Sequence, residues 1–207
     1  MAADTINMTF IGDVHGKWRQ YRNITRNLDY SLQLGDFGFQ EHVYHSKYRD
    51  PERHKVIFGN HDNTRYLHYP HSMKNHGEWF GIFCVRGALS IDRQWRIEGV
   101  SWWSDEQLEY SEMMRALEDY EKAKPSIMAT HDCPALVYPV FGYTPSKLCR
   151  TTSFFDNLFE IHKPDVWLFG HHHISTRQNI KGTEFICLSE LETLDTEIQS
   201  GTIINGL

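Results

Sequence analysis

Aspartate, asparagine and histidine residues recur at the ends of short apolar segments along this chain of 207 residues. The motifs are Gly12-Asp13-Val14-His15-Gly16, Gly35-Asp36, Gly59-Asn60-His61-Asp62, His131 and Gly170-His171-His172-His173. Carboxylate and amide oxygens and imidazole nitrogens bind divalent metal ions, and histidine is also a frequent general acid or base. The residue types therefore indicate metal-assisted or acid–base chemistry.

The segments that precede these motifs have the apolar character of short β-strands. Strands are expected over residues 7–11, 30–34, 56–58, 126–130 and 165–169, each followed at once by one motif. Sites of α/β proteins lie beyond the carboxyl ends of their strands. Five strand ends that carry potential ligands therefore predict one convergent cluster.

The rest of the chain predicts further helices and strands around that cluster. Helices are expected over residues 17–28, 105–122 and 153–162, and strands over residues 82–85, 88–91, 95–97 and 183–188. Ser104, with Gln107 three residues later, fits a capping box that would begin the middle helix. Because no repeat or linker occurs, residues 1–207 are predicted to form a single domain.

Composition narrows the class of protein. The 21 Lys and Arg residues against 27 Asp and Glu residues give a net charge of −6, which excludes a global positive field for indiscriminate nucleic-acid binding. No apolar run of membrane-spanning length occurs, so no membrane span is expected. The four scattered cysteines form no C-x-x-C pair. They indicate reduced thiols and a cytoplasmic location.

The five motifs, in this order and approximate spacing, resemble those of the calcineurin-like metallophosphoesterase superfamily, and most closely its small bacterial and viral members. The resemblance spans residues 12–173 and implies an α/β (α+β) fold, with a two-sheet β-sandwich flanked by helices and a two-metal site at one edge. One motif departs from the phosphoprotein phosphatase branch. There an Asp-Arg-Gly sequence follows, whereas here Asp36 is followed by Phe37-Gly38, so the phosphate-binding arginine is absent at that place.

The resemblance implies a role for each motif residue. Asp36 would bridge two divalent metal ions, and a carboxylate suits this role because it has two oxygens, whereas an imidazole offers a metal one nitrogen. The other implied ligands are Asp13, His15 and His173 for one metal, and Asn60, His131 and His171 for the other. Oxygen and nitrogen ligands without thiolate favour Mn²⁺ here and are also compatible with Fe, Zn, Co or Ni.

These roles imply a hydrolase of phosphate esters in which a metal-bridging hydroxide attacks phosphorus in line. His61 would stabilise the transition state or protonate the leaving alkoxide, and Asp62 would orient His61 or cap the following turn. Without the Asp-Arg-Gly arginine, a phosphodiesterase or a nucleotide-directed phosphatase is favoured over a Ser/Thr-type protein phosphatase. A nuclease that needs a partner subunit and a catalytically silent binding scaffold are the further alternatives.

Other residues bear on the substrate. Arg65 is a candidate for binding phosphate, or an exposed helix arginine. Phe141 and Tyr143, which follow His131, could form a wall for a nucleotide base or simply pack. The remaining histidines are expected at the surface: His42, His45, His54, His68, His71, His76, His162 and His172.

Overall fold

The computed structural model describes residues 5–38, 50–144, 146 and 149–207. Its first sheet has the strand order β11-β10-β1-β2-β3. The bounds are β1 (Thr5–Ile11), β2 (Tyr30–Gln33), β3 (His54–Val56), β10 (Thr193–Gln199) and β11 (Thr202–Asn205). β1, β2 and β3 run parallel, so their carboxyl ends meet at one edge of the sheet.

The second sheet has the order β4-β5-β6-β7-β9-β8. Its strands are β4 (His76–Trp79), β5 (Ile82–Val85), β6 (Ile127–Thr130), β7 (Val166–Phe169), β8 (Thr176–Ile180) and β9 (Thr183–Cys187). The four central strands are parallel, and β4 and β8 pair antiparallel at the edges. The predicted two-sheet fold is confirmed.

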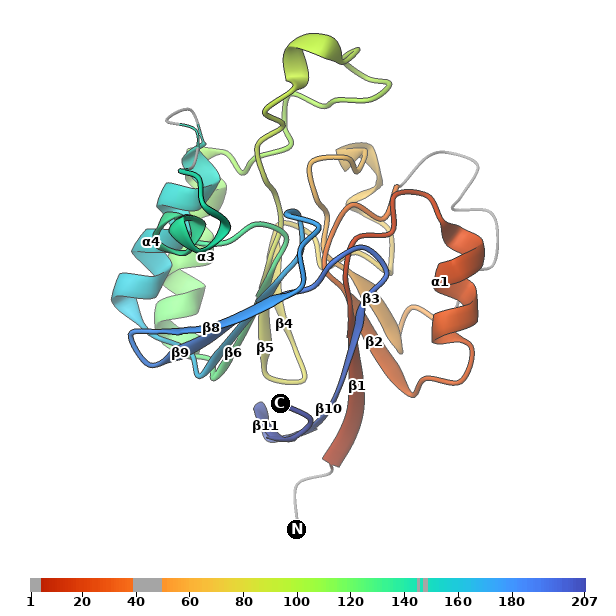
Figure 1. The fold of residues 1–207 in the computed structure, drawn as a ribbon, viewed down its shortest axis with the longest axis vertical. Helices are drawn as coiled ribbons and strands as arrows, with labels where there is room; N and C mark the ends of the chain where they lie inside the picture. The colour runs from red at the N-terminus through yellow and green to blue at the C-terminus, as the bar shows by residue number, and fades with distance from the viewer. Residues whose placement is uncertain (1–4, 39–49, 145, 147–148) are drawn as a thin grey trace.

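Helices cover the outer faces of both sheets (Figure 1). The helix α1 (Trp18–Thr25) lies against the first sheet, and α3 (Tyr110–Ala123) and α4 (Arg150–Ile161) lie against the second. Three 3₁₀ helices lie in the connections: η1 (Thr64–Tyr66), η2 (Arg93–Trp95) and η3 (Ala135–Phe141). Among the described residues, no helix combines the length and apolar character needed to cross a bilayer.

Side chains that alternate between the two faces of the strands form two apolar core layers, one between the sheets and one between the second sheet and its helices. In β7, Leu168 belongs to the apolar layer between the sheets together with Phe10 of β1. Its neighbour Trp167 faces the other way and packs with Phe155 of α4. Because strand side chains alternate between faces, a fully apolar strand fills both layers. The parallel strands are thereby fixed on both sides, which holds their carboxyl ends in place.

The helix predicted over residues 105–122 begins later, at Tyr110. Its capping box is formed by Glu109 and Glu112 rather than by Ser104. Gln107 is buried, and its Oε1 accepts hydrogen bonds from the first two backbone N–H groups of α4, at 3.0 and 3.2 Å. This long-range contact holds the segment before Tyr110 out of the helix, and the local sequence pattern carries no sign of it.

The strands predicted over residues 88–91 and 95–97 are absent from this described segment, where η2 forms instead. Residues 91–102, here called the arm, rise away from the sheets as the yellow-green segment of Figure 1. Ile91 and Trp95 on the arm are each 82% exposed. Their apolar character suggested strands, but in the structure these side chains face solvent.

Candidate metal centre

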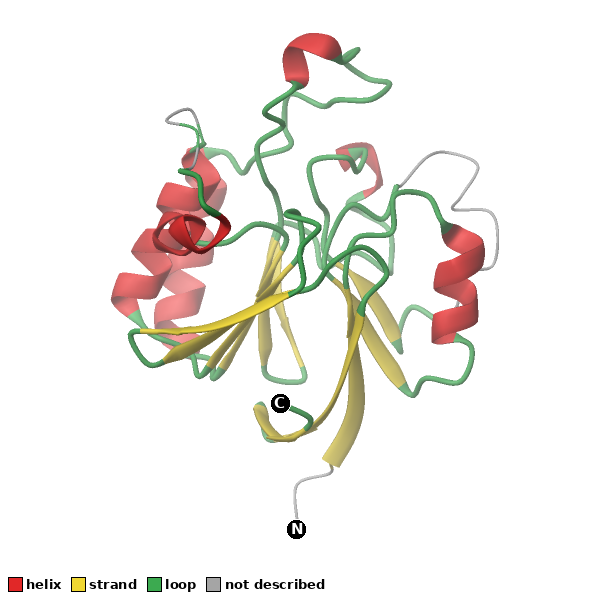
Figure 2. Cartoon of the chain, viewed as in Figure 1, coloured by secondary structure: helices red, strands yellow, loops and turns green. Residues whose placement is uncertain are grey.

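The seven predicted metal ligands lie on the loops that follow β1, β2, β3, β6 and β7. The loops at the carboxyl ends of these strands gather at one end of the two sheets (Figure 2). The ligands form two groups whose ligand atoms lie within 4.8 Å of one another. The first group is Asp13, His15 and His173, and the second is Asp36, His131 and His171. Asn60 joins the second group, since its Oδ1 lies 3.2 Å from His131 Nε2.

Asp13 anchors the first group. Its Oδ2 is buried and makes no hydrogen bond of good geometry with the described residues, although His173 Nε2 lies 3.0 Å away and His15 Nε2 3.5 Å away. Burial alone would raise the pKa of Asp13, but the two imidazoles outweigh it and lower that pKa to about 2. An ionised, buried oxygen that faces two imidazole nitrogens provides the ligands that a divalent cation requires.

Asp36 lies between the two groups. Its Oδ1 is 3.3 Å from His131 Nε2, and its Oδ2 is 3.9 Å from His15 Nε2. Burial opposes ionisation, but the charge of His131 and a hydrogen bond with it hold the pKa of Asp36 well below its usual range. The carboxylate thus presents one oxygen to each group, as a bridging ligand must.

Hydrogen bonds outside the two groups orient the imidazole of His131. Its Nδ1 donates to the Leu34 carbonyl oxygen at 2.8 Å, which directs Nε2 toward Asp36. Burial would lower the pKa of His131, but Asp36 and Asp13 overcome it and raise that pKa to about 10. In the metal-free protein a proton therefore offsets the buried carboxylates, and a divalent cation would replace it.

Two further polar residues orient the Asn60 amide. Its Nδ2 donates to Ser90 Oγ at 3.0 Å, and that hydroxyl donates to Glu106 Oε2 at 2.6 Å. All three residues are buried. The chain of bonds turns the Asn60 carbonyl oxygen toward His131, where it could serve as a ligand. Sequence analysis did not identify Ser90 or Glu106, because neither belongs to a motif.

Three motif glycines leave the space that the ligands occupy. A Cβ on Gly59 would lie 2.2 Å from Asp36 Oδ1, and a Cβ on Gly170 would lie 2.2 Å from Asp13 Oδ1. Gly35, with φ +107°, would place a Cβ 2.2 Å from His131 Nδ1. The glycines that precede Asp36, Asn60 and His171 are therefore a requirement of close packing around the carboxylates and the imidazole.

Gly59→Ala should weaken metal binding although it removes no ligand. The added methyl group would displace the Asp36 carboxylate, and changes of this kind around a metal site cost about 10–100-fold in affinity. The matched control is Gly77→Ala, where the Cβ would meet its nearest neighbour at an ordinary 3.6 Å. Isothermal titration with Mn²⁺ measures both variants. Equal affinities in the two variants would contradict this role of Gly59.

The proposed catalytic residues lie beside Asp36. His61 Nε2 is 3.8 Å from Asp36 Oδ2, and the His61 side chain is 27% exposed. Asp62 is fully buried, and its carboxylate accepts backbone N–H bonds from Gly38 at 2.7 Å and Gly59 at 2.9 Å. Asp62 thereby ties the Asp36 loop to the Asn60 loop.

A cavity of about 330 Å³ opens beside this centre. Its lining includes Asp36, His61, Tyr143 and Arg96 of the arm. Arg65, the arginine that the sequence suggested, is exposed on η1 and does not line this cavity. Arg96 is the cation that sequence analysis missed, because it lies in no motif and far along the chain from His61.

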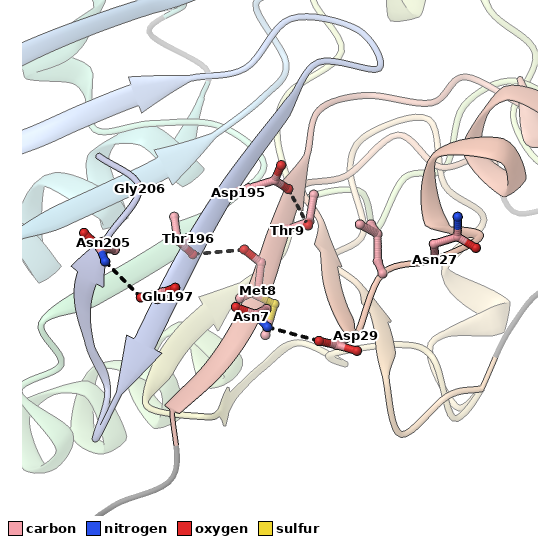
Figure 3. A pocket seen from close by; sticks show the side chains of 11 residues that line it. Asn7, Met8, Thr9, Asn27, Asp29, Asp195, Thr196, Glu197, Asn205 and Gly206 are labelled. Carbon is pink, nitrogen blue, oxygen red and sulfur yellow. Dashed lines mark hydrogen bonds between the residues drawn. The ribbon is translucent and has the colours of Figure 1, made fainter.

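A larger cavity, of about 480 Å³, lies elsewhere and contains none of the predicted site residues (Figure 3). Several of its polar groups are paired within its wall: Thr9 Oγ1 donates to Asp195 at 2.6 Å, and Asn205 donates to Glu197 at 3.0 Å. By volume this cavity would be the better candidate for a substrate site, but only the smaller cavity is lined by the predicted site residues.

Two histidines predicted at the surface are buried instead. His54 lies in β3 and its Nδ1 is 2.9 Å from the Ser31 hydroxyl. The His172 side chain is only 3% exposed, with Nε2 3.2 Å from Asp132 Oδ1 and its ring stacked 4.2 Å from that of Phe141. The backbone is left-handed at both neighbours of His172, so the alternation expected of an extended segment does not apply. The predictions for His42 and His45 fall outside the described residues.

Comparison with known proteins places these features in a family. The family model described as calcineurin-like phosphoesterase matches residues 6–175. No match was found among the curated proteins.

Solved structures share the fold at low sequence identity. A putative 5′-nucleotidase from Staphylococcus aureus aligns with a TM-score of 0.55 and 11% identity, over 98% of this chain and 53% of that one. Phosphopantetheinyl hydrolase from Mycobacterium tuberculosis aligns with a TM-score of 0.53 and 11% identity, over 92% of this chain and 91% of that one.

Proposed function

The chain belongs to the calcineurin-like phosphoesterase family, and on that premise we propose that it is a dinuclear-metal hydrolase of phosphate esters. The observation that carries the proposal is the position of Asp36, whose two oxygens face two separate ligand groups beside His61. A silent binding scaffold would have no need of a histidine that lies beside Asp36 but belongs to neither ligand group.

The donor set fits two divalent cations, for which Mn²⁺ is the proposed identity. When bound, such a pair activates a water molecule as the nucleophile and stabilises charge on the phosphoryl oxygens. Asp13 and Asp36 are the acidic ligands, so two dications would leave the centre with a net positive charge. That charge would attract a phosphate ester.

His61 would act as a hydrogen-bond donor to the substrate. Burial lowers the pKa of His61, the charge of Asp36 opposes this, and Arg96 adds to the lowering, so the net shift favours the neutral ring. Arg96 Nη1 lies 2.8 Å from His61 Nδ1, and donation at this contact would place the ring proton on Nε2, the nitrogen that faces Asp36. From there the proton can stabilise a phosphoryl oxygen or pass to the leaving alkoxide.

The substrate class is the finer part of the proposal. Nucleotides and phosphodiesters are the substrates proposed from the sequence, and Tyr143, which lines the cavity and is 44% exposed, offers a surface on which a base could stack. Diesters were favoured because the arginine of the Asp-Arg-Gly motif is absent. Arg96, from another segment, places an arginine in the cavity, so that reason for favouring diesters is weakened. The cysteines are buried and unpaired, which supports the proposed cytoplasmic location.

The direct test is metal-dependent hydrolysis of p-nitrophenyl phosphate and bis-p-nitrophenyl phosphate, measured side by side. The protein treated with a chelator should be inactive, and Mn²⁺ should restore turnover of at least one ester. If two metals bind but neither these esters nor a panel of natural phosphoesters is cleaved, the hydrolase proposal fails and the scaffold alternative replaces it.

A further inference from the structure

The arm reaches back into the cavity through one side chain. Most of the arm faces solvent, but Arg96 is only 20% exposed and lines the cavity together with Asp36 and His61. Arg96 Nη1 lies 2.8 Å from His61 Nδ1, and Nη2 lies 3.2 Å from His61 Nε2. A fixed positive charge therefore stands next to the proposed catalytic imidazole.

Contacts within the arm hold this guanidinium in place. Asp92 accepts from Arg96 Nε at 2.6 Å and from Nη2 at 2.7 Å, and the Ser101 carbonyl oxygen accepts from Nη1 at 3.1 Å. A two-point contact with a carboxylate fixes the plane of the guanidinium as well as its position. The orientation of Arg96 is thus set before any substrate arrives.

Arg96 has more N–H groups than there are hydrogen-bond acceptors around it. Arginine has five N–H groups, of which three point to Asp92 and Ser101. The remaining two, one on each terminal nitrogen, face the two ring nitrogens of His61. An imidazole has at most one acceptor nitrogen, whether neutral or protonated, so His61 cannot satisfy both N–H groups. Two oxygens of an anion could accept one hydrogen bond from each of these N–H groups.

We propose that Arg96 binds the phosphoryl group of the substrate and makes this enzyme selective for phosphate monoesters over diesters. This inference rests on the proposed function and names the substrate class of the same site. A monoester carries a charge of about −1.5 to −2 and three terminal oxygens. A diester has one charge and two terminal oxygens. A monoester therefore offers Arg96 more charge and one more terminal oxygen than a diester does.

Arg96→Ala should therefore impair monoesters selectively. The loss of hydrogen bonds to a charged group should lower kcat/KM for p-nitrophenyl phosphate by about 10–100-fold, with a change of less than about 3-fold for the diester, which makes fewer bonds of this kind. Arg96→Lys keeps the charge but not the fork of donors, and should restore part of the loss. The matched control is Arg93→Ala, which removes an exposed arginine of η2.

Binding of inorganic phosphate to the Mn²⁺-loaded protein, measured by calorimetry, tests Arg96 without relying on turnover. Arg96→Ala should raise the Kd for phosphate by about 10-fold or more, while Arg93→Ala leaves it unchanged. Equal phosphate affinity in wild type and Arg96→Ala, or an equal loss of both esterase activities, would overturn the proposal. If wild type cleaves neither these esters nor any natural phosphoester, the hydrolase proposal fails, and the phosphate affinities still decide the role of Arg96.

Discussion

Asp36→Asn is expected to lower kcat for phosphoester hydrolysis by about 10³-fold or more. A metal centre contributes several kcal/mol to stabilisation of the transition state, and each 1.36 kcal/mol corresponds to about tenfold in rate. Asparagine removes the charge that both cations would share, and its amide nitrogen cannot act as the second ligand. The variant should therefore lose at least one of the two metal ions.

The backbone should tolerate this substitution. Asp36 has φ 55°, a left-handed conformation that asparagine also adopts readily. The asparagine Oδ1 can still accept the His61 backbone N–H, which donates to Asp36 at 2.8 Å. Asp195→Asn, in the larger cavity of Figure 3, is the matched control and should keep full activity. Normal turnover by Asp36→Asn, measured with saturating Mn²⁺, would show that Asp36 is no bridging ligand.

His61→Ala is expected to lower kcat by about 10²–10⁴-fold, the usual contribution of a positioned acid or base, while two metal ions still bind. Activity should be lost without loss of metal, because His61 belongs to neither ligand group and its Nε2 lies 3.8 Å from Asp36. Steady-state kinetics together with a metal count on the same sample measure both effects.

The control for this variant is His68→Ala, which removes an exposed histidine from the same stretch of chain. It should match wild type in rate and in metal content. If His61→Ala instead loses metal in proportion to activity, then His61 is a ligand or supports one. Its proposed role as a proton donor to the substrate would then be wrong.

The ligand motifs could be read from the sequence because each is a local event. An apolar strand ends, a glycine provides space, and a ligand follows within three residues, as at Gly59 and Asn60. The parallel register then brings these ends to one edge of each sheet, and the packing of the two sheets brings the two edges together. The two-sheet fold was predicted from the family resemblance, although strands such as β6 and β7 are also recognisable as short apolar runs.

Contacts between distant segments could not be read in this way. Arg96 approaches His61 from 35 residues further along the chain, and the arm that carries it looked like a pair of strands. Gln107 bonds to the start of α4, and this long-range contact delays the start of α3. Neither contact has a periodicity or a motif, so only the folded chain shows them.

The most direct test of the central claim is a crystal structure of the protein with Mn²⁺, with the ions located by anomalous scattering. The account predicts two ions about 3.5–4 Å apart, one beside Asp13 and the other beside His131, with Asp36 between them. A single ion would contradict the dinuclear centre. So would ions bound instead at the separate group of Asp132, Cys133 and His172.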